Sequence, residues 1–402
     1  MIHIVVIDPR NIVVDSELLL GTITYKPENS NTKITCNVND PFFCLQFTSS
    51  LVLDFVFSHR TPPIQSPDAR ISDVHGHGIF DTKSMKESTI NEHHGVILDT
   101  SDPATVYGSF MFRYICVVGI RQPLSTADHI QKQRIPIFIG HRGSGANSYG
   151  SMYPENTIKS FNHAMQQRGV VGIELDVSLT ADRKLVVFHD LENGCGIPLC
   201  ELTYNDLCTE GSETNPPLLE EVLRSLQPST AGMVIELKYV SNSYAKRHPE
   251  FSKFTRQELV ETVLDCLESN WEFMQSRWLI LSSFDPDICL YLRTALSRTN
   301  FFVVHNLWLG HEADDEDNTV DFNDIRNHSW NASLAFSRGQ GLALEAGYAL
   351  SETFESNRRS FPPHDTLLLT YGRANLQTDN IRTQIQRGVN AFFIDDMKLA
   401  NN

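Results

Sequence analysis

The chain has 402 residues, 41% of them hydrophobic, which is enough for two domains with a sizeable core. Its formal net charge of −16 at pH 7 argues against nucleic acid or an anionic membrane as the main partner, because both favour basic surfaces. No apolar run approaches the roughly 18–20 residues that span a bilayer.

The N-terminus reads MIHIVVID and is predicted to form a strand. It lacks the charged start and long apolar centre of a secretion signal. We therefore expect a cytoplasmic protein whose eight cysteines remain reduced thiols. No two of these cysteines form a Cys-x-x-Cys pair, which argues against a zinc knuckle.

Residues 1–122 consist of short extended segments, rich in aromatic and β-branched side chains, with turn residues between them. This spacing predicts an antiparallel, β-sandwich-like accessory domain. The stretch 61–93 is predicted to be a long loop. This domain shows no catalytic constellation, so we expect it to be an interaction or regulatory module for an unidentified partner. The predicted strands are 2–7, 18–25, 33–38, 42–47, 51–57, 95–98 and 107–118.

A polar linker is predicted over 123–134, and strands alternate with helices over 135–400. Alternation predicts a parallel sheet, and eight strands predict a closed (β/α)8 TIM barrel. A further extended segment at 333–337 is surplus and leaves the strand assignment in 305–365 open. Helices are predicted over 154–169, 218–226, 256–268 and 287–297. The predicted barrel strands are 135–139, 170–177, 185–188, 233–237, 278–281, 301–304, 366–370 and 391–394.

Two carboxylates, Glu174 and Asp176, alternate with apolar residues on one predicted strand. At i and i+2 they point to the same face, roughly 6.5–7 Å apart along the strand. In a barrel lumen they repel each other unless a cation lies between them, and oxygen ligands favour Mg²⁺ or Ca²⁺ over zinc. Glu236 and Lys238 repeat this spacing and are expected to complete the metal shell and balance phosphate charge. The alternatives are an exposed charged strand face for the first pair and an internal salt bridge for the second.

His141 and His189 each follow an apolar run and stand beside a charged residue. Histidine titrates near neutrality, so one could give a proton to a leaving alcohol while the other accepts or directs one. Arg142 carries a guanidinium fork that matches two phosphate oxygens. His305 ends another predicted strand and is a further candidate at the barrel mouth.

Three aromatic residues, Trp278, Trp308 and Tyr371, stand near predicted strand ends. They could line a pocket for a cationic headgroup through cation–π contacts. Aromatic residues at such places are more often part of the core, so both interpretations stay open.

The polar motifs together resemble the glycerophosphodiester phosphodiesterase family, and they run in family order. Within this family, residues 282–289 and the β-rich N-terminal extension are most similar to the animal glycerophosphocholine phosphodiesterases. The matching segments are His-Arg-Gly at 141–143, Glu-Asn-Thr at 155–157, Glu-Leu-Asp-Val at 174–177, Thr-Ala-Asp at 180–182, Val-Val-Phe-His-Asp at 186–190, Glu-Leu-Lys at 236–238, Ser-Ser-Phe at 282–284 and Asp-Asp at 395–396.

The resemblance implies a TIM barrel that hydrolyses glycerophosphodiesters, with glycerophosphocholine giving glycerol 3-phosphate and choline. The chain departs from the family at 369–372, where Leu-Thr-Tyr-Gly replaces a Trp-Thr-Val-Asn-like strand end at the pocket wall. By motif position, the resemblance implies a divalent metal, Mg²⁺ or Ca²⁺, on Glu174, Asp176 and Glu236, an acid/base pair of His141 and His189, and phosphate contacts by Arg142 and Lys238.

Two alternatives remain at this point. The same site could act on lysophospholipids in the manner of a lysophospholipase D. The chain could also be a non-enzymatic interaction protein that retains the barrel, although all three predicted metal ligands and both histidines are present.

Overall fold

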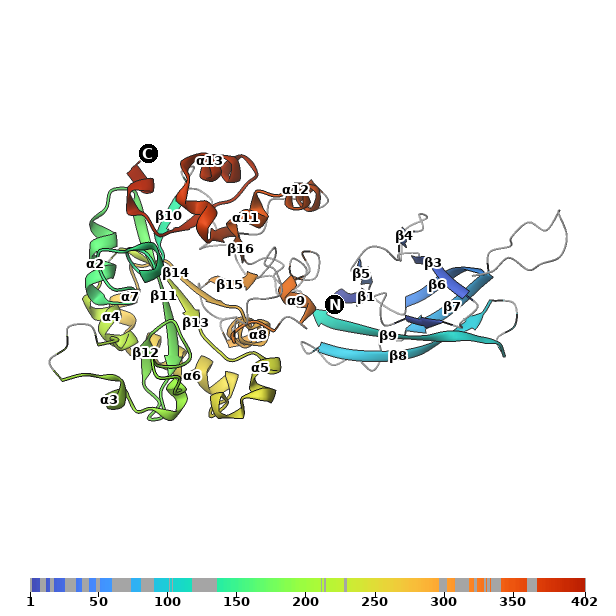
Figure 1. Ribbon diagram of the computed structural model, residues 1–402, viewed down its shortest axis with the longest axis horizontal. Coiled ribbons are helices and arrows are strands. Elements are labelled where there is room, and N and C mark those ends of the chain that lie inside the picture. The colour runs from blue at the N-terminus through green and yellow to red at the C-terminus, as the bar shows by residue number, and fades with distance from the viewer. Residues whose placement is uncertain are drawn as a thin grey trace. The chain divides into compact units, whose positions relative to one another are not determined.

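The structure is a computed structural model, and the chain divides into two compact units, Met1–Gly119 and Ile120–Asn402 (Figure 1). The predicted linker at 123–134 lies outside the described residues. The structure describes residues 2–7, 12–14, 18–25, 34–37, 43–47, 51–59, 74–80, 90–100, 102, 104–117, 136–210, 212, 215–227, 230–295, 302–307, 318–321, 324–328, 330, 333, 341–359 and 367–401.

The N-terminal unit is an antiparallel sheet of nine described strands in the order β4-β3-β6-β7-β8-β9-β1-β5, with β2 paired to β9. The predicted β-rich character is confirmed, and the described strands are linked in one hydrogen-bonded sheet. Its strands are β1 (Ile2–Ile7), β2 (Ile12–Val14), β3 (Leu18–Tyr25), β4 (Ile34–Asn37), β5 (Phe43–Phe47), β6 (Leu51–His59), β7 (Val74–Phe80), β8 (Ile90–Asp99) and β9 (Val106–Val117).

The prediction of a loop over 61–93 is wrong for part of that stretch. Strand β7 and the start of β8 lie within it. The sequence of β7, VHGHGIF, contains two glycines, which are depleted in strands, so its local signal is weak. Antiparallel pairing with β6 along the whole of β7 defines it as a strand.

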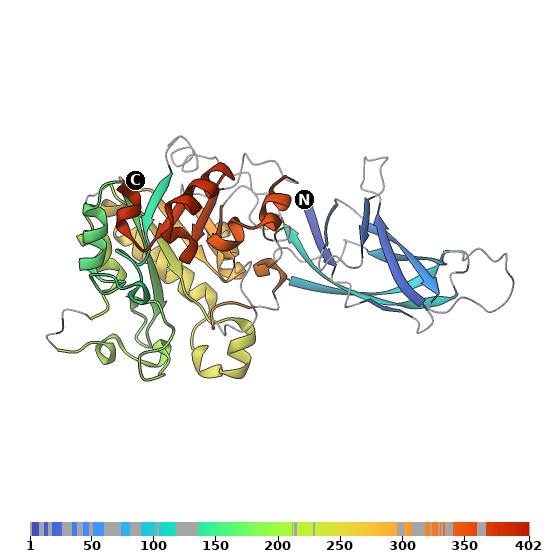
Figure 2. The ribbon, with the colours of Figure 1, turned by 45° about the horizontal axis from the view of Figure 1, so that its top comes forward.

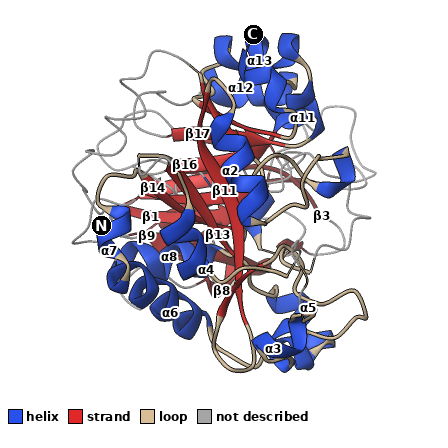
Figure 3. Cartoon of the chain, turned by 90° about the vertical axis from the view of Figure 1, so that its left-hand side faces the viewer, coloured by secondary structure: helices blue, strands red, loops and turns tan. Residues whose placement is uncertain are grey.

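The C-terminal unit is a barrel of eight parallel strands surrounded by helices (Figures 2 and 3). Strand β10 pairs with β18 on one side and with β11 on the other, and this second pairing closes the barrel. The predicted TIM barrel is confirmed. Its strands are β10 (Ile137–Gly140), β11 (Val170–Leu179), β13 (Gly232–Leu237), β14 (Leu279–Ser283), β15 (Phe302–Leu307), β16 (Gly341–Glu345), β17 (Leu367–Tyr371) and β18 (Ala391–Ile394).

One predicted barrel strand, 185–188, is wrong. Its residues form β12 (Leu185–Val187), which turns back and pairs antiparallel with the end of β11. The missing barrel strand is β16, whose sequence GLALE is short and contains no β-branched residue. Of the surplus segment 333–337, only Ser333 is described, and it is helical.

The four predicted helices correspond to α2 (Ile158–Gln166), α4 (Leu219–Ser225), α6 (Arg256–Ser269) and α8 (Pro286–Ala295). Side chains satisfy free backbone N–H groups at their starts, as when Thr157 accepts from Ser160 before α2. Among the described helices, none is both long and apolar enough to cross a bilayer. The others are α3 (Tyr204–Leu207), α5 (Asn242–Arg247), α7 (Trp271–Met274), α9 (Ile325–His328), α11 (Ala346–Ala349), α12 (Glu352–Arg359) and α13 (Thr378–Gln386), with short 3₁₀ turns between elements.

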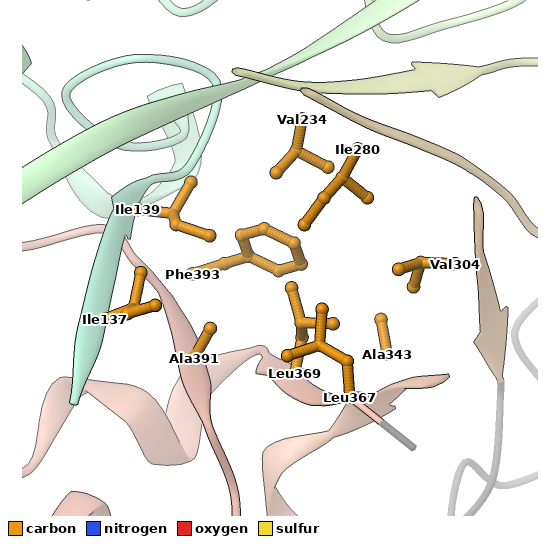
Figure 4. Packing of buried hydrophobic residues seen from close by; sticks show 10 residues of the cluster. All are labelled: Ile137, Ile139, Val234, Ile280, Val304, Ala343, Leu367, Leu369, Ala391 and Phe393. Atoms are coloured by element: carbon orange, nitrogen blue, oxygen red, sulfur yellow. The ribbon is translucent and has the colours of Figure 1, made fainter. Parts of the chain in front are cut away.

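The barrel interior is filled by apolar side chains from its strands (Figure 4). Phe393 lies at the centre of this cluster, with Ile139, Val234 and Ile280 around its ring. The barrel is therefore a packed core and not a pore, and polar side chains collect beyond the apolar cluster.

A close approach at Gly232 provides a test of this packing. A Cβ added there would lie 1.8 Å from the Trp278 indole. We expect Gly232→Ala to lower the free energy of unfolding by about 1–3 kcal/mol, because the indole or the backbone must shift. In urea unfolding, the matched change Gly194→Ala, which meets no atom within 4 Å, should stay within about 0.5 kcal/mol of the parent. Equal stability of the two variants would contradict the packing described.

Candidate active site

A cavity of about 490 Å³ opens at the carboxyl ends of the barrel strands. All seven residues predicted to bind the metal or phosphate or to act as acid or base line it, although they are up to 97 positions apart. Parallel strands in a closed barrel present their carboxyl ends at one face, so residues distant in sequence meet there. The seven are His141, Arg142, Glu174, Asp176, His189, Glu236 and Lys238.

Three of these residues form a carboxylate cluster. Glu174, Asp176 and Glu236 are buried, and one oxygen of each lies within 4.8 Å of the others. Asp176 on β11 is directly beside Glu236 on β13 in the strand register. The Lys238 ammonium lies 3.0 Å from Glu236 Oε1 and 3.7 Å from Asp176 Oδ1. The salt bridge expected as the alternative for Glu236 and Lys238 is therefore present, and it is part of the cavity wall.

His141 is held from behind by Asp395. Its Nδ1 lies 2.8 Å from Asp395 Oδ1, which also accepts a hydrogen bond from the backbone N–H of Ala146. Burial alone would lower the pKa of His141, but the Asp395 carboxylate outweighs it and the pKa is raised. Asp395 was singled out only as part of a motif. Its position directly after the apolar strand β18 is the sequence signal for a role at the cavity.

The Arg142 side chain is oriented by acidic neighbours. Its Nη1 donates to Glu155 at 3.0 Å, and its Nε lies 3.7 Å from Asp176 Oδ2. Its backbone has φ near 48° and donates its N–H to Glu174 Oε2. Asn156, which the sequence analysis placed only in a motif, donates to Asp176 at 2.8 Å. The loop after β10 therefore supports the carboxylate cluster as well as the arginine.

His189 reaches the cavity by a different route from the one predicted. It follows β12, which is not a barrel strand, and the antiparallel β11–β12 pairing brings the chain back to the level of Asp176, where Phe188 N–H donates to the Asp176 carbonyl. Its Nδ1 lies 2.6 Å from Asp190 Oδ1. The side chain is 31% exposed, so it stands at the rim of the site.

The three aromatic residues considered for a headgroup pocket differ in where the structure places them. Tyr371 lines the cavity. Trp278 does not, because it packs against the barrel core beside Gly172 and Gly232, so the core interpretation holds for it. Trp308 and the side chain of His305 lie outside the described parts of the structure.

Comparison with known proteins gives a direct result. Residues 141–399, which carry the whole cavity, match the Glycerophosphoryl diester phosphodiesterase family. The chain belongs to this family. Its members' name describes cleavage of a phosphodiester, and the arginine, lysine and carboxylates of the cavity are groups suited to binding phosphate and a cation.

Individual members of the family are distant from this chain. A glycerophosphocholine phosphodiesterase of Candida albicans is 24% identical over 77% of this chain and 32% of its own length. The human glycerophosphocholine phosphodiesterase is 29% identical over 40% of this chain and 30% of its own length. The chain thus spans about a third of the length of these relatives. A phosphodiesterase structure from Oleispira antarctica has a TM-score of 0.48 at 19% identity, over 66% of this chain and 96% of that one.

The carboxylate cluster of this family member fits a divalent cation. Burial, together with the charge of Asp176, raises the pKa of Glu174 to about 8. Burial also raises the pKa of Glu236. Burial opposes ionisation of Asp176 as well, but His189, Lys238 and Arg142 outweigh it and lower its pKa.

A second observation supports the same fit. Asn306 donates to Glu236 Oε2, while its own Oδ1 is buried without a hydrogen-bond partner among the described residues. Buried carboxylates with too little positive charge, next to an unsatisfied amide oxygen, form the oxygen-rich donor set that Mg²⁺ and Ca²⁺ prefer. Glu174, Asp176 and Glu236 are therefore the residues that could hold such an ion.

Cation binding can be tested without an activity assay. We expect millimolar Mg²⁺ or Ca²⁺ to raise the thermal unfolding midpoint by about 2–8 °C, because the ion binds only the folded cluster. Asp176→Asn should remove most of this increase. The control Asp379→Asn changes a carboxylate of 91% exposure on α13 and should keep it. An equal increase in both variants would place the cation elsewhere.

Proposed function

We propose that this chain is a metal-dependent phosphodiesterase that hydrolyses glycerophosphodiesters, with glycerophosphocholine giving glycerol 3-phosphate and choline. The observation that carries the proposal is the convergence of the carboxylate cluster, two histidines, Arg142 and Lys238 on one cavity. Membership of the family and the names of its glycerophosphocholine-cleaving relatives support it.

The proposed metal ligands are Glu174, Asp176 and Glu236. When bound, a divalent cation, Mg²⁺ or Ca²⁺, would neutralise phosphate charge at this wall. Arg142 and Lys238 would bind phosphate oxygens from positions that the acidic neighbours already fix. Such pre-positioning lowers the entropic cost of orienting the diester for attack.

His141 and His189 are the proposed acid/base pair. Because Asp395 occupies Nδ1 of His141, its Nε2 is the nitrogen left for the substrate. Asp395 also favours the protonated ring, which suits His141 to donate a proton to the leaving alcohol. His189, whose Nδ1 contacts Asp190, is then the group that accepts or directs the second proton.

The proposal extends to the organisation of the chain. We propose that the catalytic domain spans 135–400, that 123–134 is a linker, and that 1–122 is an accessory domain for an unidentified partner. A cytoplasmic location and the absence of nucleic acid from the partners are part of the same proposal. The net charge of −16 supports the latter, because phosphate backbones favour basic surfaces.

The reaction is tested with purified protein and glycerophosphocholine, with Mg²⁺ or Ca²⁺ and with or without EDTA. We expect metal-dependent release of choline in equimolar amounts with glycerol 3-phosphate. His141→Ala and His189→Ala should each lower kcat by about 10²- to 10⁴-fold, the usual size of a lost acid or base. His248→Ala, on a histidine outside the cavity, is the matched control. Unchanged turnover in both active-site variants would overturn the proposed site.

The role of Asp395 is tested by Asp395→Asn, which keeps the shape of the side chain and removes its charge. We expect kcat to fall by about 10- to 10³-fold, because the imidazole loses its negatively charged partner. The carboxylate raises the pKa of His141, so its removal lowers that pKa. The pH above which kcat falls should therefore be lower in the variant than in the parent. An unshifted profile would show that Asp395 has only a structural role.

A further inference from the structure

One carboxylate of the cavity belongs neither to the proposed metal ligands nor to the side chains proposed to bind phosphate. Glu345, at the carboxyl end of β16, lines the same cavity as the catalytic groups but lies outside the cluster of Glu174, Asp176 and Glu236. Its Oε2 accepts a hydrogen bond from the backbone N–H of Tyr348 at 3.0 Å. Within the described segments, no cationic side chain pairs with Glu345. The cavity therefore contains a negative charge that neither the proposed metal nor the phosphate uses.

Two aromatic rings line the same cavity as this carboxylate. Glu345 and Tyr371 are register partners on the neighbouring strands β16 and β17. The Tyr371 ring lies 5.8 Å from the Phe284 ring at an interplanar angle of 83°, and both rings line the cavity. An anion beside aromatic rings is the environment that binds a quaternary ammonium group, which cannot donate a strong hydrogen bond.

Gly372 makes room for this arrangement. A Cβ added at Gly372 would lie 2.9 Å from Glu345 Oε1, and the glycine has φ near 98°. A larger residue would push the carboxylate away from its place beside Tyr371. Tyr371 and Gly372 both line the cavity, so the small residue and the ring lie at the same wall as Glu345.

The arginine and lysine side chains of the cavity repel a bound cation only weakly. Arg142 contacts Glu155 and Asp176, and Lys238 contacts Glu236 and Asp176. Arg373 also lines the cavity, but it is exposed, so water screens its charge.

We propose that Glu345, Tyr371 and Phe284 form a headgroup subsite that selects diesters whose leaving alcohol carries a quaternary ammonium group. This inference rests on the proposed function and adds to it the residues that set its specificity. Glu345 attracts the positive charge, and the two rings contact the methyl groups around it.

A purely structural role for Glu345 has a different signature. Glu345 precedes α11 and caps its first turn through the Tyr348 hydrogen bond. Glu345→Gln keeps an oxygen that can accept this bond and removes only the charge. If capping were its whole role, this substitution would affect all substrates equally.

The experiment compares glycerophosphocholine with its neutral isostere, glycerophospho-3,3-dimethylbutanol, in which carbon replaces nitrogen. We expect Glu345→Gln to lower the ratio of kcat/KM between the charged and neutral diesters by about tenfold, mainly through KM, because one charged contact is lost. Tyr371→Leu should lower the same ratio, and Tyr371→Phe should retain it. Glu352→Gln, which removes an exposed carboxylate on α12, controls for net charge.

A ratio unchanged in Glu345→Gln, or an equal loss with both diesters, overturns the subsite. If the parent protein cleaves neither diester, the proposed function fails, and calorimetric titration of the two diesters decides the inference. Preferred binding of glycerophosphocholine that Glu345→Gln abolishes supports the subsite. Equal or undetectable binding of the two overturns it.

Discussion

The cavity depends on the pairing of β11 with β13, which places Asp176 directly beside Glu236 with Glu174 one alternation away. Carboxylates buried at this separation repel each other, and their burial in a low dielectric adds a desolvation penalty. Neighbouring cations compensate part of this cost, and the raised pKa of Glu174 shows that the compensation is incomplete. The remaining excess of negative charge is what makes this carboxylate cluster suited to a divalent ion.

The elements around the carboxylate cluster hold the functional side chains in position. The loop after β10 supplies Arg142, Glu155 and Asn156, and two of these contact Asp176. The end of β18 supplies Asp395, which orients His141 from the side away from the substrate space. Such outer contacts hold functional side chains in one rotamer, and small displacements of catalytic groups are costly. Below this layer, the apolar cluster around Phe393 closes the barrel and gives the cavity a floor.

The sequence was most informative where chemistry is encoded locally. Carboxylates at i and i+2 on a strand must share a face, so the spacing of Glu174 and Asp176 is enough to pair them. The sequence was least informative for strands without a local signal. The sequence GLALE of β16 has no β-branched residue, while the apolar run at 185–187 resembles a barrel strand but forms a hairpin arm. Local composition favours the wrong one of the two, and only the pairing of β16 with β15 and β17 identifies it as a barrel strand.

The sequence by itself determined most of the alternation of strands and helices, the identity of the polar residues that follow the strands, and the family to which the chain belongs. Tertiary structure decided which of those residues meet. Asp395 reaches His141 across 254 positions because β18 pairs with β10, and Glu345 lies beside Tyr371 because β16 pairs with β17. Local propensity acts within a few residues of the chain. The closure of a barrel is a long-range constraint, and it alone brings strand ends from the whole domain to one face.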